Sequence, residues 1–320
     1  MDDEHGDTHH VPILVQEILT FFPPQERETL FLDATAGGGG HSAAFLESDP
    51  RRRVISIDRD QRALERASRT LERYGTRSIL VHAEFGQLEA LDSVLADTFG
   101  DAKIGFNGIF ADLGISSDQL DDPDRGFSFR REGRLDMRMD TTQSLDAETI
   151  VNNYDAKQLT NVFRRGGLRT GVNGLVSEIL ARRPVRSTLE LASICEQVIG
   201  RRRRERPSSS HSATVPFQAI RMEVNDELGN IDRFLSSAKD RLTPGGRLAV
   251  LTFHSLEDER ITRAMRAWSR SEPGRRGLPV DRPFGAILTR DAVEAGEGER
   301  EENPRSRSAR LRVFERFAEQ

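Results

Sequence analysis

Short apolar runs alternate with helical patterns along the first third of the chain. Four of these runs have the length and composition of buried strands, and they lie at Phe31–Asp33, Arg53–Ile57, Ser78–Val81 and Gly108–Ala111. Apolar side chains at helical spacing predict amphipathic helices over residues 11–22 and 60–74. Strands that alternate with helices predict an α/β fold, in which a parallel sheet carries helices on both faces.

The alternation stops after residue 111, because the next clear strand pattern begins only at Arg247. A strand-helix-strand unit needs only about 30 residues or more, so much of this interval is additional to the sheet. Its apolar positions are spaced as in helices, and we therefore predict a helical domain inserted into a sheet domain. The expected ranges are 1–125 and 213–320 for the sheet domain and 126–212 for the insert.

Three further patterns follow the late strand. A capped helix is predicted to begin at Ser255, with Asp258 three residues later as a shortened capping box. Residues 270–310 are rich in Gly, Pro, Arg and Glu, which predicts a surface loop. Residues 312–317 alternate between polar and apolar side chains, which predicts a last strand that is either an edge strand or antiparallel.

Composition narrows the classes of protein to which the chain can belong. Only 36% of the 320 residues are hydrophobic, no apolar run is long enough to span a membrane, and the N-terminus is acidic. We therefore expect a cytoplasmic protein with no membrane partner. The single cysteine, Cys195, excludes an intramolecular disulfide and a cysteine-based zinc or iron–sulfur centre, and its apolar helical neighbours predict a buried, inert thiol.

The net charge of -5 conceals an uneven distribution. Residues 164–206 contain eleven Arg and four Glu, a local balance of +7 that leaves -12 for the rest of the chain. A run of charges is often only a solvated surface. The segment is nevertheless compatible with a nucleic-acid partner.

A glycine-rich turn joins the first predicted strand to a predicted helix. Four consecutive glycines, 37–40, let the backbone turn sharply and approach a ligand, and no Lys follows as it would in a triphosphate-binding loop. Asp58 ends the second strand, where a carboxylate can accept hydrogen bonds from ribose hydroxyls. The glycine loop and Asp58 together predict a cofactor that contains adenosine. They do not decide between NAD and S-adenosylmethionine.

Acidic residues also end two other predicted strands. Asp33 and Asp112 follow the first and the fourth strand, and the carboxyl ends of parallel strands line the cofactor crevice. An amino-acid ammonium group, which S-adenosylmethionine has and NAD lacks, would explain acids that converge there. Taken singly, each acid is typical of a helix cap or a turn.

Ordered motifs recur along nearly the whole chain, among them those at Asp33–Ser42, Asp112–Asp121, Arg125–Phe129, Leu135–Asp140 and Phe253–Asp258. They resemble the ribosomal RNA small subunit methyltransferase H family. The resemblance implies a Rossmann-like class I S-adenosylmethionine-dependent methyltransferase whose inserted helical domain binds the substrate. It implies methylation of N4 of a cytosine in the decoding centre of bacterial 16S rRNA, with the rRNA or the small ribosomal subunit as partner. It does not decide whether the protein is a monomer or a homodimer.

The resemblance also implies a set of residues that contact S-adenosylmethionine, namely Gly39, Gly40, His41, Asp58, Phe85, Asp112 and Gln119. It is weaker between Arg164 and Leu180, where the RNA-facing details of the insert depart from the family pattern. We expect the densest basic run, Arg201, Arg202, Arg203 and Arg204, to bind rRNA phosphates, and the target base to leave its stack.

Methylation of an exocyclic amine needs no protein nucleophile, whereas methylation of cytosine at C5 normally needs a Cys. Catalysis then depends on alignment of the amine with the methyl group and on an acceptor for its proton. The candidates are Asp112 or the backbone carbonyls beside it, and His254, which could equally be a structural residue at a helix start. We predict no catalytic metal, because His9, His10 and His41 lack the spacing of a metal site.

Two other functions remain open on these residues. A non-catalytic RNA-binding or ribosome-assembly factor could have kept the fold, although the glycine loop, Asp58 and Asp112 argue against it. An NAD-dependent dehydrogenase is disfavoured because no residue set for hydride transfer stands out.

Overall fold

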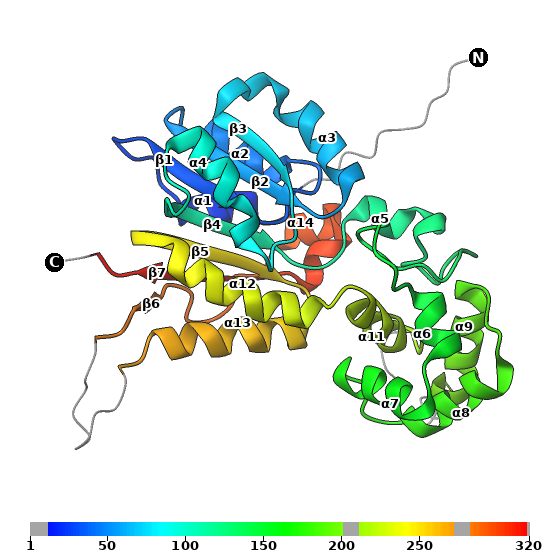
Figure 1. Cartoon of the computed structure of the whole chain (residues 1–320). Coiled ribbons are helices and arrows are strands. Elements are labelled where there is room, and N and C mark those ends of the chain that lie inside the picture. The colour runs from blue at the N-terminus through cyan, green and yellow to red at the C-terminus, as the bar shows by residue number, and fades with distance from the viewer. Residues whose placement is uncertain (1–11, 201–210, 272–281, 319–320) are drawn as a thin grey trace, which may run out of the picture. The chain divides into compact units, whose positions relative to one another are not determined.

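The computed structural model describes residues 12–200, 211–271 and 282–318, which form two compact units (Figure 1). The first unit takes in residues 1–114 and 229–320, and the second takes in residues 115–228. Both junctions differ from the expected ones, at 125/126 and 212/213. Residues 115–125 and 213–228 belong to the helical unit because their apolar side chains, such as Leu120 and Phe217, pack in its core.

The first unit is built on a seven-stranded sheet in the order β3-β2-β1-β4-β5-β7-β6. The strands are β1 (Thr29–Asp33), β2 (Arg52–Asp58), β3 (Ser78–His82), β4 (Phe106–Asp112), β5 (Leu242–Thr252), β6 (Gly285–Ile287) and β7 (Arg310–Arg316). β1 to β5 pair in parallel, and β7 runs antiparallel between β5 and β6. The predicted parallel sheet and its strands are confirmed, with most strands a few residues longer than expected.

The C-terminal part of the sheet differs from the sequence-based prediction in one respect. The last strand was expected to be either an edge strand or antiparallel. β7 is antiparallel, and it is not an edge strand. β6 lies outside it, in the segment that was predicted to be a loop. A strand of three residues is too short to produce a recognisable alternation, and it forms here because β7 offers it hydrogen-bonding partners.

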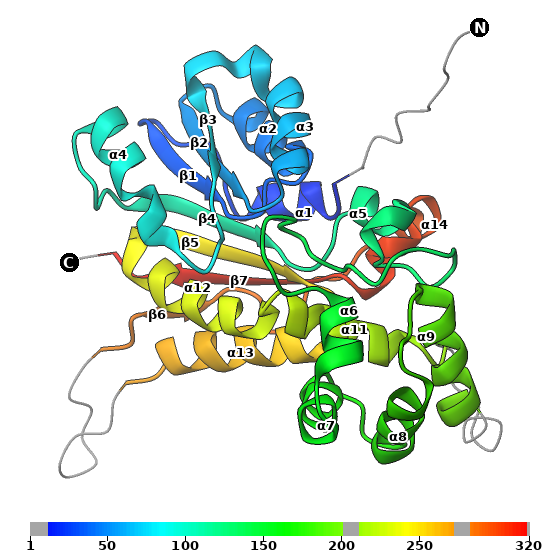
Figure 2. The same cartoon turned by 45° about the vertical axis from the view of Figure 1, so that its right-hand side comes forward.

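Helices cover both faces of this sheet (Figure 2). They are α1 (Val15–Thr20), α2 (Gly40–Ser48), α3 (Gln61–Leu71), α4 (Asp92–Phe99), α12 (Glu227–Arg241) and α13 (Ser255–Trp268), and the unit also contains α14 (Glu297–Glu302). One hydrophobic cluster joins α1, α2 and α3 to the sheet and includes Phe31, Phe45 and Phe110. α1 is shorter than predicted, because Leu14 has a left-handed backbone conformation (φ 56°) that cannot continue a helix.

The second unit is helical. It contains α5 (Ser117–Asp121), α6 (Ala147–Asn153), α7 (Ala156–Arg165), α8 (Val172–Arg182), α9 (Thr188–Cys195) and α11 (Thr214–Val224). Its core is a single cluster that includes Phe163, Leu175 and Phe217. Cys195 is buried in this cluster as a free thiol, and burial raises its pKa to about 12, which confirms the prediction of an inert cysteine. Among the described residues, no helix is long and apolar enough to cross a membrane.

Candidate functional site

The glycine loop connects β1 to α2 and is held by backbone contacts to neighbouring strands. Ala34 donates its N–H to the carbonyl of Phe110 on β4, and Ala36 donates to the carbonyl of Ile57 on β2 (both 2.8 Å). Gly37 and Gly39 have positive φ angles of 51° and 85°, which favour glycine. The loop therefore lies at the carboxyl ends of three adjacent parallel strands, where α/β proteins bind ligands.

The four glycines face different surroundings. A Cβ at Gly39 would lie 3.2 Å from Ala67 of α3, and one at Gly40 would lie 3.1 Å from Pro12. A Cβ at Gly37 or Gly38 would meet nothing within 4 Å. Gly39 and Gly40, which the resemblance assigns to the cofactor, are thus explained in part by packing, and the open side of the loop is at Gly37 and Gly38.

Asp33 is a buried residue that stabilises the glycine loop through hydrogen bonds. Its side chain is 0% exposed and accepts hydrogen bonds from the Ser42 hydroxyl (2.5 Å) and the Thr35 N–H (3.2 Å). Ser42 also hydrogen-bonds Ser56 (2.7 Å). Burial raises the pKa of Asp33 to about 6. Through these hydrogen bonds, Asp33 holds the glycine loop to the start of α2.

Asp58 joins the loop to the end of β2. Its two carboxyl oxygens accept hydrogen bonds from the backbone N–H groups of Gly37 (2.9 Å) and Asp60 (2.8 Å). Each oxygen retains a second acceptor position, which a ribose hydroxyl could use. Burial raises the pKa of Asp58 above its usual value in spite of these bonds.

Phe85 lies in the loop after β3, close in sequence to Ala83, whose N–H donates to the carbonyl of Asp58 (3.1 Å). Its ring packs edge-on against Phe234 of α12, with centroids 5.6 Å apart, and remains partly exposed. The neighbouring Glu84 accepts a hydrogen bond from Asn230 of α12 (2.7 Å). The sequence did not single out Asn230, because its partner lies 146 residues away.

Asp112 ends β4 and is a further buried acid at these strand ends. Its N–H donates to the Thr35 hydroxyl (2.6 Å), while its Oδ1 atom is buried and has no hydrogen-bond partner. Burial, followed by the nearby charges of Asp33 and Glu257, raises its pKa to about 8. A buried carboxyl oxygen without a partner next to the glycine loop is suited to a cationic or hydrogen-bond-donating ligand.

His41, the second residue of α2, is 8% exposed. Its Nε2 is 2.9 Å from the carbonyl oxygen of Ile13, so Nε2 carries the proton and donates it. Its Nδ1 lies 3.9 Å from Asp112 Oδ2, and its ring centroid lies 4.5 Å from that of Phe110. His41 therefore links the segment before α1 to the end of β4.

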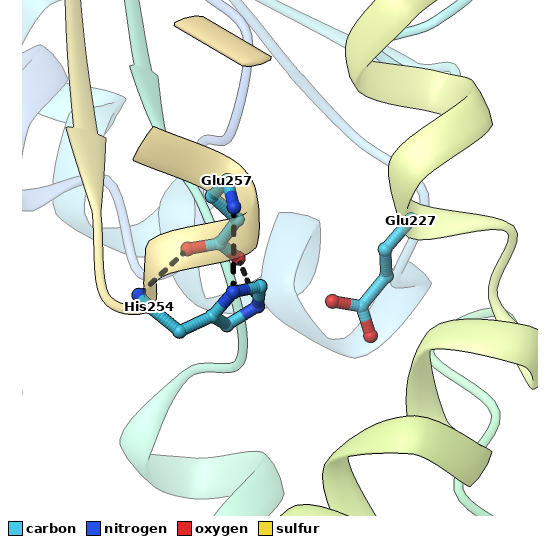
Figure 3. Close-up of side chains that lie close together, drawn as sticks. All are labelled: Glu227, His254 and Glu257. Atoms are coloured by element: carbon cyan, nitrogen blue, oxygen red, sulfur yellow. Dashed lines mark hydrogen bonds and ion pairs between the residues drawn. The ribbon is translucent and has the colours of Figure 1, made fainter. Parts of the chain in front are cut away.

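His254 follows β5 and caps α13. Its Nδ1 accepts a hydrogen bond from the Glu257 N–H (3.4 Å), and the Glu257 carboxylate accepts one from the His254 N–H (3.2 Å) (Figure 3). Glu257 also accepts a hydrogen bond from the Phe253 N–H (2.8 Å). The cap thus lies one residue earlier than predicted, with Glu257 and not Asp258 as its partner. Asp258 instead pairs with Arg312 of β7 (2.8 Å).

The structure places His254 at the same edge of the sheet as Asp112. Asp112 pairs with Leu251 across β4 and β5, and His254 follows three residues after Leu251. The Nε2 atom of His254 is 3.0 Å from Glu257 Oε1, but the two are not aligned for a hydrogen bond. Glu227, also drawn in Figure 3, belongs to the second unit.

The remaining predicted residues belong to the second unit or are outside the described residues. Gln119 belongs to the second unit, where its side chain accepts from the Ser116 N–H (3.1 Å) and completes a capping box at the start of α5. The basic run Arg201, Arg202, Arg203 and Arg204 lies outside the described residues, as do His9 and His10. The first unit therefore brings together Asp58, Asp112, His41 and the glycine loop.

The parallel sheet, the glycine loop and the acidic strand ends are those of a Rossmann-like protein that binds an adenosine-containing cofactor, and the family match that follows makes the chain a class I S-adenosylmethionine-dependent methyltransferase. The sequence profile described as the MraW methylase family matches residues 7–317. The chain belongs to the MraW methylase family, which confirms the family that the motifs indicated.

Relatives of this chain carry a common name. Ribosomal RNA small subunit methyltransferase H of Trichormus variabilis is 39% identical over 317 residues, which cover 99% of this chain and 94% of the relative. The protein of the same name from Thermomicrobium roseum is 41% identical over 319 residues, with 97% and 94% covered. A solved rRNA methylase from Streptococcus thermophilus aligns with a TM-score of 0.38 and 12% identity, over 91% of this chain and 87% of that one.

Proposed function

We propose that this enzyme transfers the methyl group of S-adenosylmethionine to N4 of a cytosine in the decoding centre of bacterial 16S rRNA. The observation that carries the proposal is the name shared by relatives at about 40% identity over nearly the whole chain. The substrate is 16S rRNA or the small ribosomal subunit, and the activity belongs in the cytoplasm.

The residues of the first unit suit the cofactor. The open side of the loop at Gly37 and Gly38 leaves room for a ligand to approach the backbone. Asp58 would accept hydrogen bonds from the ribose hydroxyls, and Phe85 would lie against the adenine. His41, Gly39 and Gly40 would act through the shape of the loop, because they are packed against other parts of the unit.

When bound, S-adenosylmethionine supplies an electrophilic methyl group, and the amine that accepts it must lose one proton. Asp112 is our candidate to hold that proton, because its Oδ1 is unpartnered and its pKa of about 8 allows either protonation state near neutral pH. A cation beside Asp112 would favour the carboxylate, which is the form that accepts a proton. His254 already serves as the cap of α13, so we prefer Asp112 to His254 as the residue that accepts the proton.

The proposal is tested by incubating the purified protein with tritiated S-adenosylmethionine and small ribosomal subunits from a strain that lacks it. We expect label in the 16S rRNA that is recovered as N4-methylcytidine after digestion to nucleosides. Treatment of the enzyme alone with EDTA, followed by its removal before the Mg²⁺-containing reaction, should leave the rate unchanged, because we propose no tightly bound catalytic metal. Absence of transfer, together with normal binding of S-adenosylhomocysteine, would favour a non-catalytic RNA-binding factor.

Binding of the cofactor is tested separately by calorimetry. S-Adenosylhomocysteine should bind, whereas NAD should not. An Asp112→Asn variant that binds S-adenosylhomocysteine normally and methylates at the wild-type rate would exclude Asp112 as the proton acceptor. A His254→Gln variant with the wild-type rate at all pH values from about 6 to 8 would exclude His254.

A further inference from the structure

A loop of the second unit presents several arginines to solvent. Arg130, Arg131 and Arg134 are exposed, and Arg186 is exposed on the segment that pairs with this loop. We call residues 130–134 the arginine loop, and Arg186 is its neighbour on the pairing segment. Within the described parts of the chain, none of the four guanidinium groups makes an ion pair or a hydrogen bond. Their charges are therefore available to a partner.

The backbone of the arginine loop is held in place on one side by the start of α9. Arg134 forms an antiparallel bridge with Ser187. Gly133 and Thr188 are joined by two hydrogen bonds, from the Gly133 N–H to the Thr188 hydroxyl and from the Thr188 N–H to the Gly133 carbonyl (both 3.0 Å). The Thr188 hydroxyl also donates to the carbonyl of Arg131 (2.9 Å). These bonds place the loop next to Arg186.

The base of the loop is closed by two close approaches of the backbone. A Cβ at Gly126 would lie 2.1 Å from the carbonyl oxygen of Arg134, and one at Gly133 would lie 2.1 Å from that of Pro123. Glycine is therefore required at both positions. A backbone fixed in this way loses little conformational freedom when a ligand binds, so only the arginine side chains must become ordered.

An aromatic stack begins at the residue before the arginine loop. The rings of Phe129 and His211 are stacked, with centroids 4.8 Å apart and planes inclined by 24°. Phe129 rests edge-on against the buried Phe217 at 5.1 Å, whereas His211 is exposed. The Ala213 N–H donates to His211 Nδ1 (3.1 Å), which fixes the orientation of the ring.

We propose that single-stranded RNA binds along the arginine loop, with phosphates on its guanidinium groups and one base stacked on the His211 ring. Arginine matches phosphate in geometry and charge, and bases stack on aromatic side chains with little sequence preference. Glu132 and Glu190 lie in the same two segments, so the local balance is +2. The inference rests on RNA as the substrate, and it assigns RNA binding to residues other than the predicted Arg201–Arg204.

The charge component is tested with the full-length protein and a fluorescein-labelled single-stranded RNA of about twelve nucleotides. Binding is measured by fluorescence anisotropy over a range of salt concentrations. The combined change of Arg130, Arg131, Arg134 and Arg186 to Gln should make the slope of log affinity against log salt shallower by about two to three, since each phosphate contact contributes about 0.7. An unchanged slope would overturn the inference.

A matched control replaces three exposed arginines of the first unit by Gln, namely Arg27, Arg69 and Arg266. It should leave the slope close to that of the wild-type protein. If the control variant makes the slope shallower by as much per arginine as the arginine-loop variant does, the effect comes from overall charge. The arginine loop is then not the RNA-binding surface. Melting temperatures and binding of S-adenosylhomocysteine should be unchanged in both variants.

The stacking component is tested with two substitutions of His211. His211→Asn keeps an acceptor for the Ala213 N–H and removes the ring, whereas His211→Phe keeps a ring and removes the acceptor. We expect RNA affinity to fall about tenfold in the Asn variant and to stay near the wild-type value in the Phe variant. The reverse order would show that the histidine is only structural. An acidic protein partner would depend on the arginines and not on the ring.

The inference and the proposed function can fail separately. If the wild-type protein methylates small subunits but the arginine variant keeps its affinity and salt slope, the surface is wrong and the function stands. If the wild-type protein binds RNA through the arginine loop but transfers no methyl group, the function is wrong and the surface stands.

Discussion

The two units place their charged side chains in contrasting environments. In the first unit, Asp33, Asp58 and Asp112 lie at the ends of adjacent strands, and burial raises the pKa of each. In the second unit, the arginine loop is exposed and without ion pairs among the described residues. Buried charges respond to protonation, whereas exposed charges are screened by salt. We therefore expect cofactor affinity to depend on pH and RNA affinity to depend on salt.

The largest expected effect concerns Asp58. Asp58→Ala removes the carboxylate that accepts hydrogen bonds from the N–H groups of Gly37 and Asp60. The same carboxylate is the proposed partner of the ribose. Affinity for S-adenosylhomocysteine, measured by calorimetry, should fall by about 100-fold, because the two hydrogen bonds from the ribose hydroxyls to the carboxylate are lost. Asp60→Asn is the control, since Asn can still cap α3, and it should bind normally. Equal losses in both variants would contradict the assigned role.

The dependence on pH is expected to come from Asp112. Its pKa is raised to about 8, so below that pH a cationic ligand must displace a proton from the carboxyl group. Affinity for S-adenosylmethionine should therefore rise by up to about tenfold per pH unit as the pH increases toward 8, and then level off. In Asp112→Asn the profile should be flat and the affinity lower at pH 8. A flat profile in the wild-type protein would remove the contrast between the two units.

A smaller effect is expected from the hydrogen bonds that hold Asp33. Ser42→Ala deprives this fully buried carboxyl of its 2.5 Å hydrogen bond, and it also leaves Ser56 without that partner. The free energy of unfolding, measured in urea at neutral pH, should fall by about 1–3 kcal/mol. Ser68→Ala changes an exposed serine on α3 and should cost less than about 0.5 kcal/mol. Equal costs would mean that the Asp33 network contributes nothing specific.

The smallest effect is expected from Cys195. Its thiol is buried in the core of the second unit with a pKa of about 12, so it takes no part in the chemistry. Cys195→Ala should keep the methyl-transfer rate within about twofold and lower stability by about 1 kcal/mol. Loss of transfer in a variant that remains folded, shown by circular dichroism, would indicate a covalent mechanism and methylation at carbon.

Local patterns in the sequence were sufficient for much of the sheet and for the site at its edge. The strands from β1 to β5, the glycine loop, Asp58 and Asp112 were all recognisable, because apolar runs and turn residues report local conformation. β6 was missed because three residues carry too little pattern. The cap of α13 was placed one residue late, because a Ser followed by Asp resembles a capping box as closely as His254 with Glu257 does.

By itself, the sequence determined the α/β class, the inert cysteine, the acids at the strand ends and the family. Only the tertiary structure decided which glycines face open space, that Asp112 keeps an unpartnered oxygen and that Arg134 lies beside Ser187. The physical reason is the distance along the chain between the partners. Periodicity and turn chemistry act over a few residues, whereas burial, pKa and close backbone approach depend on segments that meet only when the chain has folded.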